Sequence, residues 1–312
     1  MRASVIIPAR NAAALLPRAL RAVAEQTLDG GYELIVVDDG SSDGTAAAAE
    51  SAGARVVRSA RPRGPGAARN AGAAAANGDA LAFLDADCVP APGWLSAGVF
   101  ALERAGLVQG RVEPDPHAVR GPYDRTLWVT GATGLYESAN LFVRREVFER
   151  LGGFDDGLLE LAGDHFGEDV IFGWRVRRAG VETAFCAPAL AHHAVFPRGP
   201  RGFVDERRRL ALFPHLARRV PELRDEFFYR RWFLSRRSAS VALATAGAAA
   251  AIGSRRNPVV AAGAVAAGPY ARALVADARA AGARVALVRA AADVVGLAAL
   301  TRGSIAARTP LL

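Results

Sequence analysis

Lysine is absent from this 312-residue sequence, and all 39 of its basic residues are arginines. Together with the excess of alanine, this absence reflects high genomic GC content more than a function. Cysteine is scarce as well: Cys88 and Cys186 stand in apolar, strand-like settings. Two such residues form no disulfide framework and have no metal-ligand spacing. We therefore expect a cytoplasmic protein, and the first strand begins so close to Met1 that no signal peptide is expected.

Long apolar runs are also missing. Residues 238–254 and 258–271 carry no charge, but they are only 17 and 14 residues long and mostly alanine. A membrane-spanning helix needs about 20 predominantly apolar residues. A hairpin through the bilayer would also place Arg255 and Arg256 on the outer side, against the positive-inside tendency. Helices packed on the protein or along a membrane interface are favoured over true spans, and a last helix is expected over 284–301.

Charge is divided unevenly along the chain. Residues 1–197 carry a net charge of −5 and residues 198–312 a net charge of +13. Between Arg198 and Arg237 arginines alternate with aromatic residues, a pattern typical of segments that contact a membrane surface. No nucleic-acid-binding motif accompanies it. We expect residues 201–312 to form a basic helical extension that contacts the inner face of the plasma membrane.

Two carboxylates, Asp85 and Asp87, follow the apolar run Leu81–Leu84, which predicts a buried strand. Such a pair can hold a hard divalent cation such as Mg²⁺ or Mn²⁺, which would neutralise a diphosphate. Alone, an Asp-x-Asp pair is equally typical of a solvated strand end, so its meaning depends on other segments.

Three further polar segments follow predicted strands or enter helices. They are Ser4–Asn11, Glu33–Thr45 and the glycine-punctuated basic loop Arg61–Gly72. Leu34–Val37 is wholly apolar, as expected for a parallel strand covered on both faces. Open α/β sheets bind ligands at the carboxyl ends of their strands, so these segments predict a site for a nucleotide diphosphate and a metal.

These segments resemble the donor-binding half of inverting family 2 glycosyltransferases, which have the GT-A fold. The resemblance continues, in the family order, through Glu137–Arg145, Leu151–Asp156 and Gly167–Gly180, and it covers roughly residues 1–197. It implies a mixed, mostly parallel sheet flanked by helices in residues 1–200, followed by the arginine- and alanine-rich helical extension.

The resemblance also implies roles for individual residues. A nucleoside-diphosphate sugar would be bound by Pro8, Ala9, Arg10, Asp39, Arg69, Asn70 and Asp85. Asp39 has suitable chemistry, since a carboxylate accepts hydrogen bonds from ribose hydroxyls, and Arg69 suits phosphate contacts. For Asp39 the alternative is a capping role in a tight turn, and for Arg69 a solvated charge at a helix start.

Asp87 would be the main metal ligand, with Asp85 assisting and His193 as a further candidate. His192 and His193 follow a strand predicted over Glu182–Cys186, and a loop histidine held by hydrogen bonds is the alternative for either.

Glu168 and Asp169 precede a helix. By the resemblance, Asp169 would remove the proton of the acceptor hydroxyl and Glu168 would orient acceptor or base. The alternative is an acidic pair that stabilises a helix N-terminus. Glu137 and Ser138 stand where relatives often carry glycines, and Asn140 either contacts sugar or satisfies backbone groups.

The sequence thus predicts a metal-dependent, inverting glycosyltransferase. A sugar-phosphate nucleotidyltransferase is an alternative, but residues 8–12 lack its glycine-rich loop. An oxidoreductase fits less well, because Gly64–Gly66 is a poor dinucleotide fingerprint. A non-catalytic, membrane-tethered scaffold is the alternative from another class. The acceptor is open, and the basic extension favours a membrane-borne, lipid-linked one.

Overall fold

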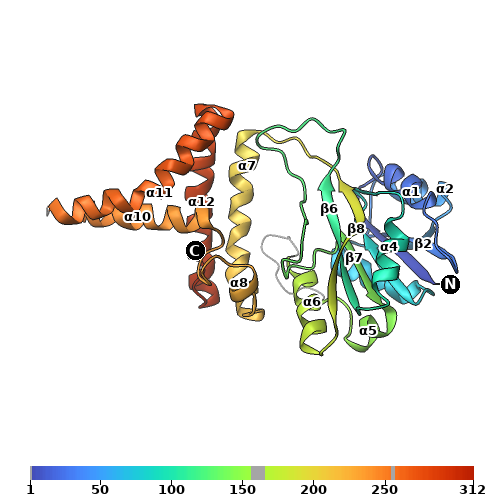
Figure 1. Cartoon of the computed structure of the whole chain (residues 1–312). Coiled ribbons are helices and arrows are strands. Elements are labelled where there is room, and N and C mark those ends of the chain that lie inside the picture. The colour runs from blue at the N-terminus through green and yellow to red at the C-terminus, as the bar shows by residue number, and fades with distance from the viewer. Residues whose placement is uncertain (1, 156–165, 254–256) are drawn as a thin grey trace. The chain divides into compact units, whose positions relative to one another are not determined.

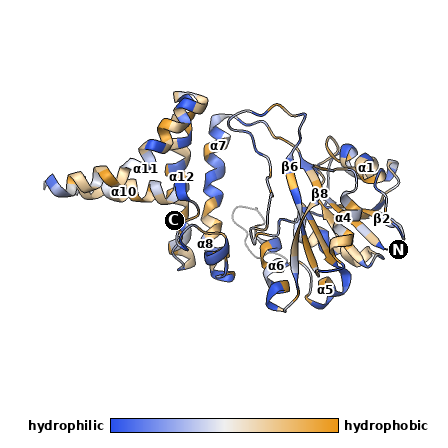
Figure 2. Cartoon of the chain, in the orientation of Figure 1, coloured by the Kyte–Doolittle hydropathy of each residue, from blue (hydrophilic) through white to orange (hydrophobic). Residues whose placement is uncertain are grey.

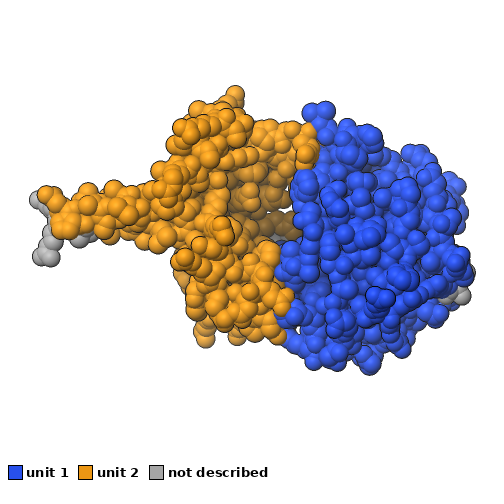
Figure 3. Space-filling model, viewed as in Figure 1, with its two compact units in different colours: residues 1–119, 126–195 blue, residues 120–125, 196–312 orange. Residues whose placement is uncertain are grey.

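The computed structural model describes residues 2–155, 166–253 and 257–312. Asp156, Arg255 and Arg256, which entered the sequence predictions, lie outside the described residues. The chain forms two compact units: residues 1–119 with 126–195, and residues 120–125 with 196–312 (Figure 3).

The first unit is built on an eight-stranded sheet in the order β3-β2-β1-β4-β7-β6-β8-β5 (Figure 1). Its first half is parallel and consists of β1 (Ala3–Ala9), β2 (Tyr32–Asp38), β3 (Arg55–Arg58) and β4 (Ala80–Leu84). The connections between these strands contain α1 (Leu16–Ala24), α2 (Thr45–Ser51) and α3 (Pro65–Ala75). This alternation brings the carboxyl ends of β1, β2 and β4 to one edge of the sheet.

The second half of the sheet is mixed. It consists of β5 (Cys88–Pro90), β6 (Leu107–Pro114), β7 (Asn140–Arg144) and β8 (Thr183–His193). Strand β7 is antiparallel to both β4 and β6, whereas β8 is parallel to β6 and antiparallel to β5. The helices of this half are α4 (Trp94–Ala101), α5 (Arg145–Arg150) and α6 (Glu168–Arg178).

Apolar side chains fill the core of this unit and explain its layers. The central strands β1 and β4 are almost wholly buried, as expected where both faces of a sheet are covered, and Figure 2 shows apolar residues along the strands. Helix α1 places Leu16, Leu20 and Val23 on one buried face, the spacing of an amphipathic helix. Trp94 is fully buried.

One sequence prediction about β8 was wrong. The strand does not end at Cys186 but continues to His193, because a register shift at Gly110 and Arg111 lets it keep pairing with β6 and then with β5. His192 and His193 therefore lie in a strand and not in a loop.

The second unit is helical. It contains α7 (Pro200–Glu206), the 3₁₀ helix η1 (Arg207–Leu212), α8 (Phe213–Arg219), α9 (Leu223–Glu226), α10 (Arg236–Gly253), α11 (Asn257–Ala281) and α12 (Ala283–Ala307). The basic, aromatic segment thus forms short pieces, and its Phe213, Phe227 and Phe228 rings pack on one another. Within the described ranges, no helix combines the length and the apolar character that crossing a bilayer requires.

Candidate active site

The carboxyl ends of β1 and β2 meet at the start of the site. Ala9 pairs with Asp38, and the Asp39 N–H donates to the Ala9 carbonyl at 2.9 Å. Ala9 is buried, Pro8 is half-buried and the Arg10 side chain is exposed. The structure therefore brings these three residues, predicted to hold the nucleotide, beside Asp39.

Asp39 organises the basic glycine loop. Its two carboxylate oxygens accept the backbone N–H groups of Arg63 and Gly64, each at 2.9 Å. Gly64 has a positive φ of 95° and leads directly into α3. Asp39 itself is only 4% exposed. Asp39 thus caps the loop, as its alternative role predicted. It does so at the end of the strand where the nucleotide was expected.

Arg69 links the two acidic motifs of the site. It lies on α3, its side chain is 4% exposed, and its NH2 group is 2.5 Å from Asp85 Oδ1. Its NH1 group is 3.5 Å from Glu168 Oε1. One buried guanidinium therefore connects residues that are 83 positions apart in the sequence.

Burial disfavours the charge of Arg69, yet the carboxylates of Asp85, Glu168 and Asp169 outweigh it and hold the arginine pKa above its usual value. Arg69 Nε is buried without a hydrogen-bond partner among the described residues. Buried polar atoms are normally satisfied, so this nitrogen is an exception among the polar atoms of the site.

Glu168 and Asp169 form the first turn of α6, after Gly167 in a left-handed conformation. Asp169 Oδ2 accepts the Ser138 N–H at 3.1 Å and the Ser138 hydroxyl at 3.4 Å. Burial first, and then the charge of Glu168, raises the pKa of Asp169 to about 7, although the Ser138 N–H and Arg69 oppose the shift. A carboxyl with such a pKa can exchange a proton near neutral pH.

Asp87 and His193 face each other from β5's start and β8's end. Asp87 Oδ2 lies 3.5 Å from His193 Nε2. His193 Nδ1 is 2.6 Å from the Ala194 carbonyl, which accepts the Nδ1 proton and fixes that tautomer. In the neutral ring Nε2 then carries a lone pair on the side of the carboxylate.

The structure does not gather all the predicted metal ligands into one cluster. Asp85 is engaged by Arg69, and no group of three or more His, Cys, Asp or Glu side chains suited to a metal occurs among residues 2–155, 166–253 and 257–312. Two of the predicted ligands, Asp87 and His193, lie adjacent to each other.

Two predicted contact residues serve the protein's own backbone. Asn70 donates to the Phe154 carbonyl at 2.8 Å and accepts the Phe154 N–H at 2.9 Å. Asn140 is fully buried, accepts from Trp94 Nε1, and donates to the carbonyls of Arg111 and Ala189, each bond being 2.8 Å.

Sequence reasoning missed the partnership between Ser138 and Asp169, because 31 residues separate them and no local pattern indicates the contact. The neighbouring Glu137 has a buried Oε2 that finds no hydrogen-bond partner in the described structure, and burial raises the pKa of this carboxyl. The departure from glycine at this position was the signal available in the sequence.

Comparison with known proteins identifies the family of this chain. The model of glycosyl transferase family 2 matches residues 4–152. Glycosyltransferase AglE from Haloferax volcanii is 34% identical over 212 residues, which cover 63% of this chain and 68% of AglE. The pre-mycofactocin glycosyltransferase of Mycobacterium tuberculosis is 32% identical over 211 residues, but the match covers only 42% of that protein.

A solved structure supports the fold. The mannosyltransferase PcManGT from Pyrobaculum calidifontis, in complex with GDP-Man and Mn²⁺, superposes with a TM-score of 0.60 at 23% identity. The match covers 95% of this chain and 87% of PcManGT. The expected GT-A architecture, a mixed sheet flanked by helices with further helices at the C-terminus, is confirmed. The match to the family model and the similarity to AglE show that this chain belongs to glycosyltransferase family 2.

Proposed function

We propose that this enzyme transfers a sugar from a nucleoside-diphosphate sugar to an acceptor hydroxyl, with inversion at the anomeric carbon. The observation that carries the proposal is the Arg69 link between Asp85 at the end of β4 and Glu168 at the head of α6. This link brings the Arg69 guanidinium, which is suited to phosphate, close to the Asp169 carboxyl, which is suited to proton transfer.

Asp169 is the general base. Its carboxylate accepts the proton of the acceptor hydroxyl while that oxygen forms a bond to the anomeric carbon. The bond between this carbon and the diphosphate oxygen breaks, and its electron pair leaves with the nucleoside diphosphate. A single displacement of this kind inverts the anomeric centre. The Ser138 N–H and hydroxyl hold the base in place, and a pKa of about 7 lets it accept a proton near neutral pH.

The donor diphosphate lies against Arg69 in this proposal. Negative charge develops on the diphosphate as the glycosidic bond breaks, and a buried guanidinium stabilises it more strongly than an exposed one would. The Asp39 contacts fix the loop that leads into α3, and this fixes the position of Arg69. Asp39, Pro8, Ala9 and Arg10 surround the nucleoside, with Asp39 as an acceptor for ribose hydroxyls.

A divalent cation fits the pair formed by Asp87 and His193. Carboxylate oxygen and imidazole nitrogen are suitable donors for Mn²⁺, and Mg²⁺ or Mn²⁺ sites commonly combine one or two protein ligands with substrate phosphates. When bound, such a cation would neutralise the departing diphosphate as a Lewis acid. Asp85 assists by positioning Arg69.

We propose a membrane-borne, lipid-linked acceptor at the inner face of the plasma membrane, because residues 198–312 carry 20 arginines against 7 acidic residues. Such a segment is attracted to anionic lipid.

Thermal-shift titration with UDP- and GDP-sugars, with and without MnCl₂, tests the donor and metal assignments together. One class of donor should raise the melting temperature, and Mn²⁺ should increase that shift. Asp87→Asn and His193→Gln should each abolish the Mn²⁺-dependent part. Glu113→Gln is a matched control, because Glu113 precedes the end of the neighbouring strand β6 and pairs with Arg111 instead. Absence of any donor-dependent shift in the wild-type enzyme would refute the proposal.

A further inference from the structure

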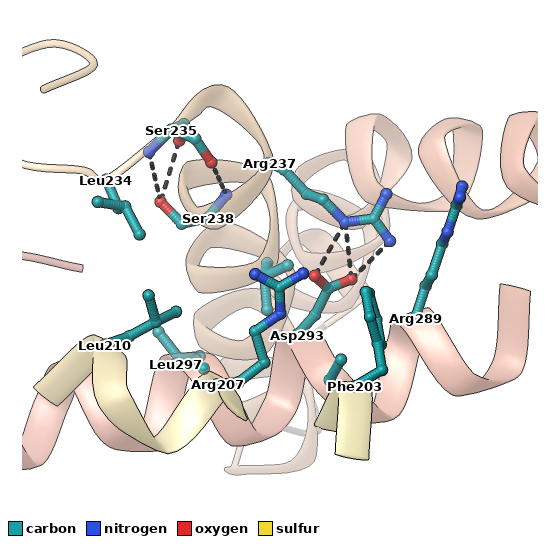
Figure 4. Close-up of a pocket in the computed structure, with 13 residues that line it drawn as sticks. Phe203, Arg207, Leu210, Leu234, Ser235, Arg237, Ser238, Arg289, Asp293 and Leu297 are labelled. Atoms are coloured by element: carbon teal, nitrogen blue, oxygen red, sulfur yellow. Dashed lines mark hydrogen bonds and ion pairs between the residues drawn. The ribbon is translucent and has the colours of Figure 1, made fainter. Parts of the chain in front are cut away.

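The second unit contains a cavity of about 360 Å³ bounded by α7, η1, α10 and α12 (Figure 4). Its wall has two kinds of lining. Apolar contributions come from Phe203, Leu210, Leu234, Val241 and Leu297, and charged ones from Arg207, Arg237, Arg289 and Asp293. A cavity of this volume and composition is within the range of small-ligand sites.

Two of the arginines, Arg237 and Arg289, form ion pairs with aspartates. Arg237 donates hydrogen bonds to the Asp293 carboxylate from Nε at 2.9 Å and from Nη2 at 2.7 Å, and its Nη1 lies 2.8 Å from Asp277 Oδ2. Arg289 pairs with Asp277, and the Tyr270 hydroxyl donates to Asp293 at 3.0 Å. These contacts satisfy both aspartates.

Arg207 is different. Its guanidinium lies 4.7 Å from the centre of the Phe203 ring and has no hydrogen-bonded or ion-paired partner among the residues that the structure describes. The adjacent Glu206 is paired with Arg198, and Asp293 is held by Arg237. In Figure 4 the Arg207 side chain points into the space between the Ser235–Ser238 turn and the Arg237–Asp293 pair.

The charges around the cavity favour an anion beside Arg207. Three arginines meet two aspartates, which leaves one positive charge over. Burial is the largest influence on the pKa of Arg207 and lowers it. Glu206 and Asp293 oppose this shift, and the positive charges of Arg198 and Arg237 add smaller lowering contributions. An anion bound at Arg207 would offset the cost of burying its charge.

We propose that this cavity binds a phosphate ester with an aliphatic body, the phosphate at Arg207 and the aliphatic part against Leu210, Leu234 and Leu297. Arginine presents several N–H donors in a fork that matches phosphate oxygens. The apolar wall favours a ligand with a hydrocarbon part over inorganic phosphate, because burial of hydrocarbon is favourable. The site lies within the second unit, so it stands independently of the proposed glycosyl transfer.

Isothermal titration of the full chain tests this with octyl phosphate, kept below its micellar concentration, against inorganic phosphate and 1-octanol. Octyl phosphate should bind at least about tenfold more tightly than either of the others, since both head and chain contribute. Arg207→Gln should weaken octyl phosphate about tenfold to a hundredfold. Leu297→Gln should reduce octyl phosphate binding toward that of inorganic phosphate.

Arg208→Gln is the matched control: it makes the same change one residue along, where the side chain is 75% exposed and pairs with Asp205. It should leave binding unchanged. Without ligand, Arg207→Gln should melt no lower than the wild type, because it removes a half-buried charge that has no partner. Equal binding by wild type and Arg207→Gln, or a structural loss on that substitution, overturns the proposal. Inorganic phosphate binding as tightly as octyl phosphate overturns the aliphatic part and identifies a free-phosphate site.

Discussion

Among single residues, Asp169 combines position and proton affinity. It stands in the first turn of α6, is held by Ser138, and has a pKa near 7 because burial and Glu168 disfavour its charge. The dipole of α6 favours a negative charge at this end, so the helix limits a shift that burial drives upward. Residues placed in this way titrate within the range in which enzymes work.

Asp169→Asn should lower kcat by about 10²- to 10⁴-fold, because the amide cannot accept the acceptor proton. Donor affinity should stay within about twofold of the wild type, since in our proposal the donor is held by other groups. Nucleotide release assays and donor titration measure the two quantities.

Glu146→Gln is the control for this substitution. Glu146 occupies the same position in the first turn of α5, but its side chain is 74% exposed and it pairs with Arg144. Activity should be unchanged. If Asp169→Asn loses donor binding together with kcat, the assignment of Asp169 as the base is wrong.

The raised pKa of Asp169 also predicts how activity and stability depend on pH. If Asp169 is the base, as we propose, it acts when ionised, so kcat should rise with pH through about 7. Stability runs the other way. A carboxyl whose pKa rises from 3.8 to about 7 on folding favours its protonated form, so its contribution is lost as pH increases over that interval.

Asp169→Asn should therefore melt above the wild type at pH 8, and the difference should shrink toward pH 4. Thermal melts of both proteins across this range measure it. A difference that is constant with pH would show that Asp169 is not the group that titrates.

Among the elements, Asn140 joins three strands of the second half of the sheet to a helix. From the start of β7 it bonds α4 through Trp94, β6 through Arg111 and β8 through Ala189. The Cβ of any residue replacing Gly110 would come within 2.4 Å of the Asn140 side chain, so the strand beside it must carry glycine. The amide is thus a structural contact in a fully buried position.

Asn140→Ala should reduce the free energy of unfolding by about 3 kcal/mol or more, because it leaves one donor and two carbonyls buried without partners. Trp94→Phe removes only one of these bonds and should cost less through that bond, although it also loses ring volume. Denaturant titration of both variants compares them. If Asn140→Ala is neutral, a polar network at this junction does not stabilise the sheet.

The elements also show where the sequence was sufficient. Apolar runs predicted strands correctly, as Leu81–Leu84 did for β4 (Ala80–Leu84), because burial on both faces leaves a local signature. The same reasoning could not place β6, which lies in a stretch without clear periodicity, or extend β8 to His193. Both depend on pairing with distant strands, and the continuation of β8 also depends on the register shift between Gly110 and Arg111.

Within the site, the sequence identified acids and Arg69 but not their connections. That Arg69 joins Asp85 to Glu168, or that Ser138 holds Asp169, follows from a helix and strands that meet only in the folded chain. For Asn70 the motif indicated a contact with the nucleoside-diphosphate sugar. In the structure its side-chain amide is hydrogen-bonded to the Phe154 backbone. Its donor role stays a prediction.

For the whole molecule, the uneven distribution of charge predicts salt-sensitive attraction to anionic surfaces. Residues 198–312 hold 20 arginines and 7 acids. Each arginine near an anionic bilayer contributes about 1 kcal/mol at most, and the attraction decays over roughly 8 to 10 Å at physiological salt. Several exposed arginines acting together would retain the protein at such a surface.

Flotation with vesicles should therefore recover the full chain with phosphatidylglycerol but not with phosphatidylcholine alone. Raising NaCl to 1 M should release it, because the screening length falls to about 3 Å. Equal recovery with both lipids would show that charge does not direct the contact. Recovery with neither would refute the proposed membrane surface.

Arg69 gives the enzyme a constraint on how it can change. One guanidinium balances Asp85 on one side and Glu168 with Asp169 on the other. In our proposal Asp85 faces the nucleotide, and Glu168 and Asp169 face the acceptor. A substitution that alters nucleotide preference around Asp85 would redistribute that shared counter-charge and alter the proton affinity of the base. Selection for a new donor and selection for a new acceptor would consequently not be independent in this enzyme.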